Sequence, residues 1–202
     1  MRYLLLAILL IGLVQAASIT APLVAVDPIS NQGILGNVTL EEIDSIDPVL
    51  LSENIILDST TLASVRNAVL YARNLTSSDT SFRLTFSFPT RSVSGGSAGA
   101  TIALAATCLM QNQTYPDLVL TGDIDASGNI LQTGGITQKA VAAANSGYKL
   151  VVVPTNQSKY YVYERYGSMM LARHLDDALL EVFGTEVREA GTIAELAAKD
   201  LK

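Results

Sequence analysis

The sequence predicts a single domain of the α+β class. Strand-like and helix-like segments follow one another without the regular βαβ repeat of a parallel α/β protein. The chain has 202 residues, which is enough for one proper hydrophobic core. No long linker, internal repeat or low-complexity tract divides it. These observations favour one compact unit that combines small groups of strands with helices.

The composition excludes several classes of function. The formal net charge is −6, and the basic residues are scattered, so a nucleic-acid partner is not expected. Cys108 is the only cysteine and His174 the only histidine, which leaves neither an internal disulfide nor a credible zinc site. Because Cys108 lies in an apolar run, we expect a buried core thiol.

Residues 1–17 have the features of a signal peptide. Arg2 precedes an apolar run of eleven residues (4–14), which is short of the about 20 that a membrane-spanning helix needs, and the small pair Ala16-Ala17 follows. An uncleaved membrane tether is the alternative. Either reading places the protein outside the cytoplasm, in the medium or at the cell surface. Four N-x-[ST] triplets are compatible with export, although such triplets also arise by chance: Asn37, Asn74, Asn112 and Asn156.

The first half of the domain, which we expect to span residues 18–186, shows four elements. Strands are predicted from Ile19 (ITAPLVAV) and from Gly36 (GNVTLEEI). Asp58-Ser59-Thr60 offers N-cap side chains for a helix with Leu62, Val65 and Val69 on one face. FRLTFSF at 82–88 alternates apolar and polar residues, which predicts a half-buried strand.

The second half begins with a glycine-rich loop and an apolar helix over residues 97–111. Residues 118–135 predict two strands joined at DASGN, and Thr137 is expected to cap the short helix QKAVAAAN. KLVVVP at 149–154 is typical of a buried strand. From Tyr160 onward a helical pattern is expected, with Leu175, Leu179 and Phe183 on one stripe, and residues 187–202 form a tail with a short helix.

The run Gly95-Gly96-Ser97-Ala98-Gly99 has the form G-x-S-x-G, which points to a nucleophilic serine that needs a base. His174 would serve in the chain order of an α/β-hydrolase. That fold requires the serine on a tight turn directly between a strand and a helix, whereas residues 89–96 intervene here. His174 also lies in the apolar helical pattern, so an ordinary surface or interfacial histidine is the favoured reading.

Lys139 is the second candidate base. A lysine accepts a proton only when it is neutral, and burial in apolar surroundings favours the neutral amine. Gly134-Gly135-Ile136 precede Lys139, four alanines lie among the next five residues, and no carboxylate stands nearby in the sequence. A solvent-exposed lysine in a short helix is the alternative.

GGSAGATIALAATCLM and DLVLTGDIDASGNILQTGGITQKAVAAANSGYKLVVVP together resemble the proteolytic domain of the Lon proteases, which use a Ser-Lys dyad. The ordered match comprises a serine at the head of a helix, Thr121-Gly122-Asp123, a hairpin glycine, Gly134-Gly135 and Lys139. It is strongest over 82–154 and weaker over 19–183. It implies a Lon-type fold of mixed small sheets and packed helices, and it removes His174 from the site.

The resemblance also implies roles. Ser97 is the nucleophile, and Lys139 is the general base and later the proton donor. Thr121 hydrogen-bonds the lysine amine, or is simply a β-branched strand residue. Gly95 and Gly96 let a substrate backbone approach, and amides around Ser97 bind the oxyanion. No cofactor is implied, and family members tend to form hexameric rings.

Three features depart from the family. Ser94 stands where an acidic residue is common, and Thr85 and Ser87 stand where bacterial members have histidines. The 202 residues hold no G-x-x-x-x-G-K-[ST] phosphate loop. We therefore expect an ATP-independent serine endopeptidase that acts on flexible or unfolded polypeptides. The alternatives are a silent binding or assembly module with the same fold, and a Ser-His esterase that uses His174.

Overall fold

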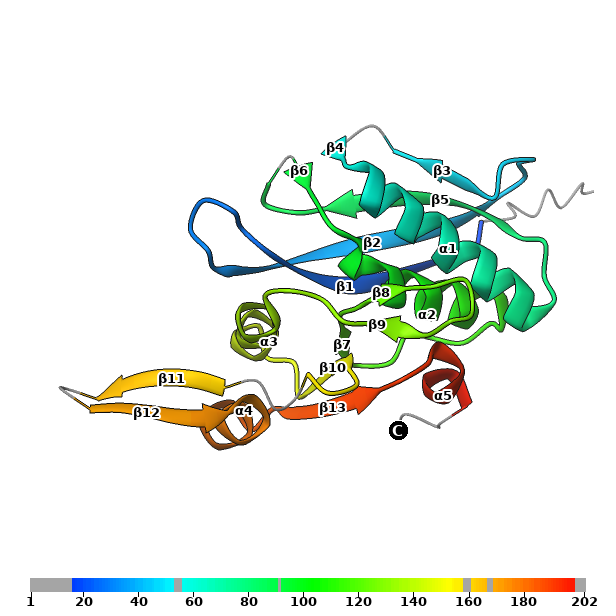
Figure 1. The fold of residues 1–202 in the computed structure, drawn as a ribbon. Coiled ribbons are helices and arrows are strands. Elements are labelled where there is room, and N and C mark those ends of the chain that lie inside the picture. Colours follow the sequence, from blue (N-terminus) through cyan, green and yellow to red (C-terminus); the bar gives the residue numbers. More distant parts are fainter. Residues whose placement is uncertain (1–15, 53–55, 91, 158–160, 167–168, 199–202) are drawn as a thin grey trace, which may run out of the picture.

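The computed structural model describes residues 16–52, 56–90, 92–157, 161–166 and 169–198. It confirms a mixed fold of small sheets and packed helices (Figure 1). Residues 1–15 of the predicted signal peptide (1–17) lie outside the described residues. No helix within the described ranges is long and apolar enough to cross a membrane.

A four-stranded sheet forms the upper layer in Figure 1, with the strand order β1-β2-β5-β3. Its strands are β1 (Ser18–Val26), β2 (Gly33–Ile43), β3 (Val49–Leu51) and β5 (Ser81–Ser87). The β1-β2 and β2-β5 pairs are antiparallel, whereas β3 runs parallel to β5. The predicted alternation in β5 is confirmed, because Phe82, Leu84 and Phe86 are buried and Arg83 and Thr85 are exposed.

Helix α1 (Ser59–Thr76) begins at the predicted cap. The Asp58 carboxylate accepts a hydrogen bond from the Thr61 amide at 2.8 Å, which satisfies one of the free N–H groups of the first turn. Val65 and Val69 are buried as expected, whereas Leu62, at the start of the same helix face, is 38% exposed. The apolar stripe of α1 therefore continues through Ala68 and Ala72, which are small and allow close packing.

A single 3-10 turn, η1 (Gly96–Ala98), leads into α2 (Gly99–Met110). All residues of α2 from Gly99 to Leu109 are buried, including Cys108, as predicted. The alanines of α2 allow α1, β1 and α5 (Ile193–Ala198) to pack around it. This central helix fixes the position of the turn at its N-terminal end.

Three strands form a second, parallel sheet in the order β13-β10-β7. They are β7 (Val119–Leu120), β10 (Leu150–Pro154) and β13 (Glu186–Ala190). β13 spans the expected boundary between the domain and its tail, and Ile193 and Leu196 of α5 are buried in the main core. Residues 186–198 therefore pack as part of the same unit.

The predicted hairpin at DASGN joins β8 (Asp123–Ile124) to β9 (Ile130–Leu131). Helix α3 (Ile136–Asn145) follows, but its cap is not the predicted Thr137. Gly135 precedes the first turn at φ 68°, a left-handed conformation that glycine adopts without steric cost. Because the glycine turns the chain, the helix starts at Ile136, two residues before the start that a cap at Thr137 indicates.

The helical prediction from Tyr160 onward is wrong for residues 161–166 and 169–174. There β11 (Tyr161–Tyr166) and β12 (Met169–His174) form an antiparallel ribbon, and only then does α4 (Leu175–Phe183) begin (Figure 1). Tyrosine and valine favour strands, and this preference outweighs the weak helical spacing. Within α4 the expected stripe is confirmed, because Leu175 and Leu179 are buried and Phe183 packs beside them.

Candidate active site

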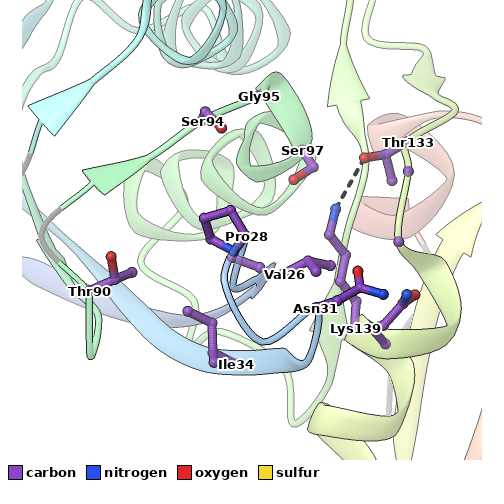
Figure 2. Close-up of a pocket in the computed structure, with 14 residues that line it drawn as sticks. Val26, Pro28, Asn31, Ile34, Thr90, Ser94, Gly95, Ser97, Thr133 and Lys139 are labelled. Carbon is purple, nitrogen blue, oxygen red and sulfur yellow. Dashed lines mark hydrogen bonds between the residues drawn. The ribbon is translucent and has the colours of Figure 1, made fainter.

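A cavity of about 500 Å³ lies where three segments meet. These are the end of β1 with the turn that follows it, the loop before η1, and the segment that enters α3 (Figure 2). The lining residues are Ala25, Val26, Pro28, Asn31, Ile34, Thr90, Ser94, Gly95, Ser97, Thr133, Gly134, Gly135, Gln138 and Lys139. The fold thus brings Ser97 and Lys139, the two residues that the sequence singles out, to one cavity.

The backbone around Ser97 is fixed by the segment after β7. The Gly122 amide donates to the Ser97 carbonyl oxygen at 3.0 Å, and the Ala100 amide donates to the Gly122 carbonyl oxygen at 3.0 Å. These two bonds tie the start of α2 to the Thr-Gly-acid segment. The partly exposed Ser97 hydroxyl is carried at the N-terminal end of the helix, where N–H groups and the helix dipole favour negative charge.

The glycine loop before Ser97 is anchored on the first turns of α1. Asp58, Thr61 and Ser64 lie three residues apart, so they share one face of the helix. Asp58 accepts from the Gly95 amide at 3.3 Å, and the Thr61 hydroxyl donates to the Gly95 carbonyl oxygen at 3.1 Å. The Ser64 hydroxyl is shared between the Gly96 carbonyl oxygen at 2.7 Å and the Asp123 carboxylate at 2.5 Å. From the sequence, Asp58 is expected only as a helix cap, so its contact with the glycine loop is new.

The two predicted loop glycines take different places. Gly95 lines the cavity at φ 92°, but its N–H donates to Asp58 and is therefore engaged inside the protein. Gly96 is buried, and a side chain there would collide with the Asp123 carboxylate. Position 96 therefore requires glycine, because the carboxylate of Asp123 in the Thr121-Gly122-Asp123 segment occupies the space that a side chain would need.

Lys139 is buried, with only 5% of its surface exposed. Burial lowers the pKa of its amine from 10.5 to about 8, because an ammonium ion loses hydration there. The cavity lining contains no other ionisable side chain among the described residues. At mildly alkaline pH a large fraction of Lys139 is therefore neutral and able to accept a proton.

The lysine amine contacts a different threonine from the predicted one. Lys139 Nζ donates to Thr133 Oγ1 at 3.1 Å. The Thr121 hydroxyl is buried and makes no hydrogen bond in the described part of the chain. The expected hydrogen bond between Thr121 and Lys139 is therefore absent from this arrangement, since the amine reaches the loop before α3 and not the end of β7. Sequence reasoning missed Thr133, although it directly precedes Gly134-Gly135.

The remaining residues singled out by the sequence lie at the edge of the site or away from it. Ser94 lines the cavity and is exposed. Thr85 is exposed on β5, where its hydroxyl pairs with Ser52 at 2.7 Å, and Ser87 is exposed at the end of the same strand. His174 ends β12 and does not line the cavity.

Comparisons with known proteins point to one family. The family described as the Lon protease (S16) C-terminal proteolytic domain matches residues 63–163. Lon protease 2 of Borreliella burgdorferi is 38% identical over 68 residues, which cover 33% of this chain and 8% of that protein. The archaeal Lon protease of Methanocaldococcus jannaschii is 31% identical over 113 residues, or 52% of this chain and 17% of that protein. The chain thus spans a small part of the length of these relatives.

Proposed function

Since the chain belongs to the family of the Lon protease (S16) C-terminal proteolytic domain, a family of Ser-Lys serine peptidases, we propose that it cleaves polypeptides with Ser97 as nucleophile and Lys139 as base. The observation that carries the proposal is the shared cavity. It combines a serine hydroxyl at a helix N-terminus with a buried lysine whose pKa is lowered to about 8. A serine nucleophile requires an adjacent base of this kind.

The reaction follows from these two side chains. The neutral Lys139 amine takes the proton of the Ser97 hydroxyl as Oγ bonds to the peptide carbonyl carbon. The resulting ammonium then gives that proton to the leaving amine as the C–N bond breaks, which leaves an ester on Ser97. Lys139 next takes a proton from water as the water attacks the ester, and it returns the proton to Ser97 Oγ when the acid leaves. The backbone amides at the start of η1 are the proposed donors to the oxyanion.

The proposed substrates are flexible or unfolded polypeptides, and the proposed cleavage requires no ATP. Two sequence features support this part: the 202 residues contain no phosphate loop, and residues 1–17 have the features of an export signal. Unfolding an ordinary domain costs about 5–15 kcal/mol, which binding at a small cavity does not normally supply. We propose action outside the cytoplasm. We also propose that the protein forms a ring-shaped homo-oligomer, and that an uncleaved N-terminal segment would tether it to the membrane.

A panel of variants tests the dyad. Cleavage of casein and of a fluorogenic peptide is measured for wild type, Ser97→Ala, Lys139→Ala and His174→Ala. The first two substitutions should each remove nearly all turnover, because the two residues act as one unit. His174→Ala is the control and should retain wild-type rates. Full activity of Lys139→Ala would refute the proposed base, loss of activity in His174→Ala would favour the esterase-like alternative, and an inactive wild type would favour the silent module.

A further inference from the structure

Thr133 is the side chain that contacts the amine of the proposed base. Its hydroxyl accepts the hydrogen bond from Lys139 Nζ at 3.1 Å, as the dashed line in Figure 2 shows. Thr133, Lys139 and Ser97 all line the same cavity. Lysine is a flexible four-carbon chain, so a hydrogen-bond partner at its tip decides where the nitrogen lies.

Thr133 is itself held at both of its backbone polar groups by one side chain. The Gln157 amide donates from Nε2 to the Thr133 carbonyl oxygen at 2.8 Å, and Gln157 Oε1 accepts from the Thr133 amide at 3.2 Å. Gln157 is 1% exposed. Its backbone N–H donates to the carbonyl oxygen of Pro154 at the end of β10. The two-point contact therefore fixes the backbone of Thr133 against the parallel sheet.

We propose that Thr133 is the positioning residue of the Lys139 base and that Gln157 acts through it. The inference rests on the proposed Ser-Lys peptidase. One N–H of the amine is taken by Thr133, which leaves the lone pair of the neutral amine for the Ser97 hydroxyl. Without this partner the buried amine samples several rotamers, and a small displacement of a catalytic group lowers the rate steeply.

The same hydrogen bond bears on protonation. An oxygen that accepts from an ammonium group stabilises the charged form, so the Thr133 hydroxyl favours a higher pKa of Lys139 than an apolar side chain at this position would. The other polar side chains of the cavity lining are uncharged: Asn31, Thr90, Ser94, Ser97 and Gln138. Loss of the Thr133 hydroxyl should therefore lower the pKa of Lys139, with no neighbouring charge to mask the change.

The first test is the pH dependence of kcat/KM for wild type, Thr133→Val and Thr133→Ser. Valine keeps the shape of threonine and removes the hydroxyl, whereas serine keeps the hydroxyl. In Thr133→Val the alkaline plateau should fall about tenfold or more, and the midpoint of the rise should move down by about one pH unit. Thr133→Ser should restore both. A merely structural role would lower the plateau without moving the midpoint, and that result would overturn the proposal.

The second test requires no peptidase activity. In the Ser97→Ala background, Lys139 is modified with an amine-directed reagent at a series of pH values, and the rate is measured by mass spectrometry. Thr133→Val should move the reactivity midpoint to lower pH by the same amount. An unchanged or higher midpoint refutes the role of Thr133. A third result is that wild type shows no Ser97-dependent cleavage while Thr133→Val still moves the reactivity midpoint of Lys139. That result would refute the proposed peptidase function but support the hydrogen bond between Thr133 and Lys139.

The role of Gln157 is tested by a double-mutant cycle with Gln157→Met, a residue of similar length that lacks the amide. Because both residues act through one hydroxyl, the losses in plateau kcat/KM for Gln157→Met and Thr133→Val should not add. Thermal unfolding identifies any variant that is not folded at the assay temperature, and the assay is then repeated at a lower temperature. Fully additive losses would show that Gln157 does not act through Thr133.

Discussion

At the residue scale, burial of the Lys139 amine lowers the free energy of unfolding but makes the amine available as a base. Its amine has a pKa of about 8 in the folded chain against 10.5 in the unfolded one. Between these values the unfolded chain binds more protons, so the free energy of unfolding should rise with pH from about 8 to 10.5. Lys139→Met should therefore stabilise the protein at pH 7 by up to about 3 kcal/mol, and the gain should vanish above pH 10.5.

Urea unfolding of both forms at pH 7 and pH 10.5, followed by circular dichroism, measures this difference. Lys149→Met serves as the control, because the Lys149 amine lies at an exposed site where it donates to the Phe183 carbonyl oxygen. A Lys139→Met protein that is less stable than wild type at pH 7 would show that the buried amine contributes favourably to the fold. That outcome would remove the physical argument that it is retained for catalysis.

The pKa of Lys139 also sets the pH dependence of the reaction. Since the base must be neutral, kcat/KM should rise as pH passes through about 8 and then level off. Lys139→Arg should be inactive across the whole range, because a guanidinium stays protonated. Initial rates of peptide cleavage between pH 6 and 10 provide the measurement. A wild-type profile that is flat across this range, or an active arginine variant, would contradict the assignment.

The sequence singles out Ser97 and Lys139 because each stands in an ordered motif of glycines and small residues, and the structure brings both to one cavity. It could not identify Thr133 or Gln157, since their roles depend on contacts between the loop before α3 and the turn after β10. For the same reason it favoured Thr121. A threonine in a family motif is visible in the sequence, but the direction in which a lysine extends inside a cavity is not.

At the element scale, the start of α1 both caps the helix and supports the nucleophile loop. Asp58→Ala removes the cap and the acceptor for the Gly95 amide. It should lower the melting temperature by a few degrees and reduce kcat, because the loop before Ser97 loses an anchor. Asp47→Ala is the matched control, since the Asp47 carboxylate accepts a similar bond from the Val49 amide at the start of β3, whereas Asp58 also accepts from the Gly95 amide of the loop before Ser97.

Thermal denaturation and kcat are measured together for these two variants. Asp47→Ala should lower the melting temperature without changing kcat. Equal kcat values for Asp58→Ala and wild type would show that the loop is held well enough by Thr61 and Ser64, and that Asp58 acts only as a helix cap.

Elements with a clear period were the predictable ones. The alternation of β5 and the stripes of α1 and α4 can be read from the chain because one face of each is buried. Strands β3, β4 (Ile56–Leu57) and β6 (Ser92–Val93) have two or three residues, which is too short to show any period. The β11-β12 ribbon was not predicted, because the spacing of its apolar and polar residues also fits a helix. The strand propensity of its tyrosines and valine is what favours the strands that the structure shows.

At the scale of the whole molecule, the proposal limits what the enzyme can digest. A scissile peptide must reach Ser97 in an extended form, and the proposed cleavage involves no ATP-driven unfolding of the substrate. A destabilised mutant of a test domain should therefore be cleaved at a rate that follows its unfolded fraction, while the stable parent stays intact. A time course on both substrates, with and without Mg-ATP, measures this. Stimulation by ATP, or equal digestion of both forms, would overturn the proposal.

The most direct test of the Ser97–Lys139 dyad is labelling with a fluorophosphonate probe, mapped by mass spectrometry. The probe reports an activated serine whatever the natural substrate is. Wild type and His174→Ala should each be labelled at Ser97, at a rate that rises with pH through about 8. Lys139→Ala and Lys139→Arg should lose this labelling while they remain folded. Undiminished labelling of Ser97 in Lys139→Ala, or its loss in His174→Ala, would contradict the dyad.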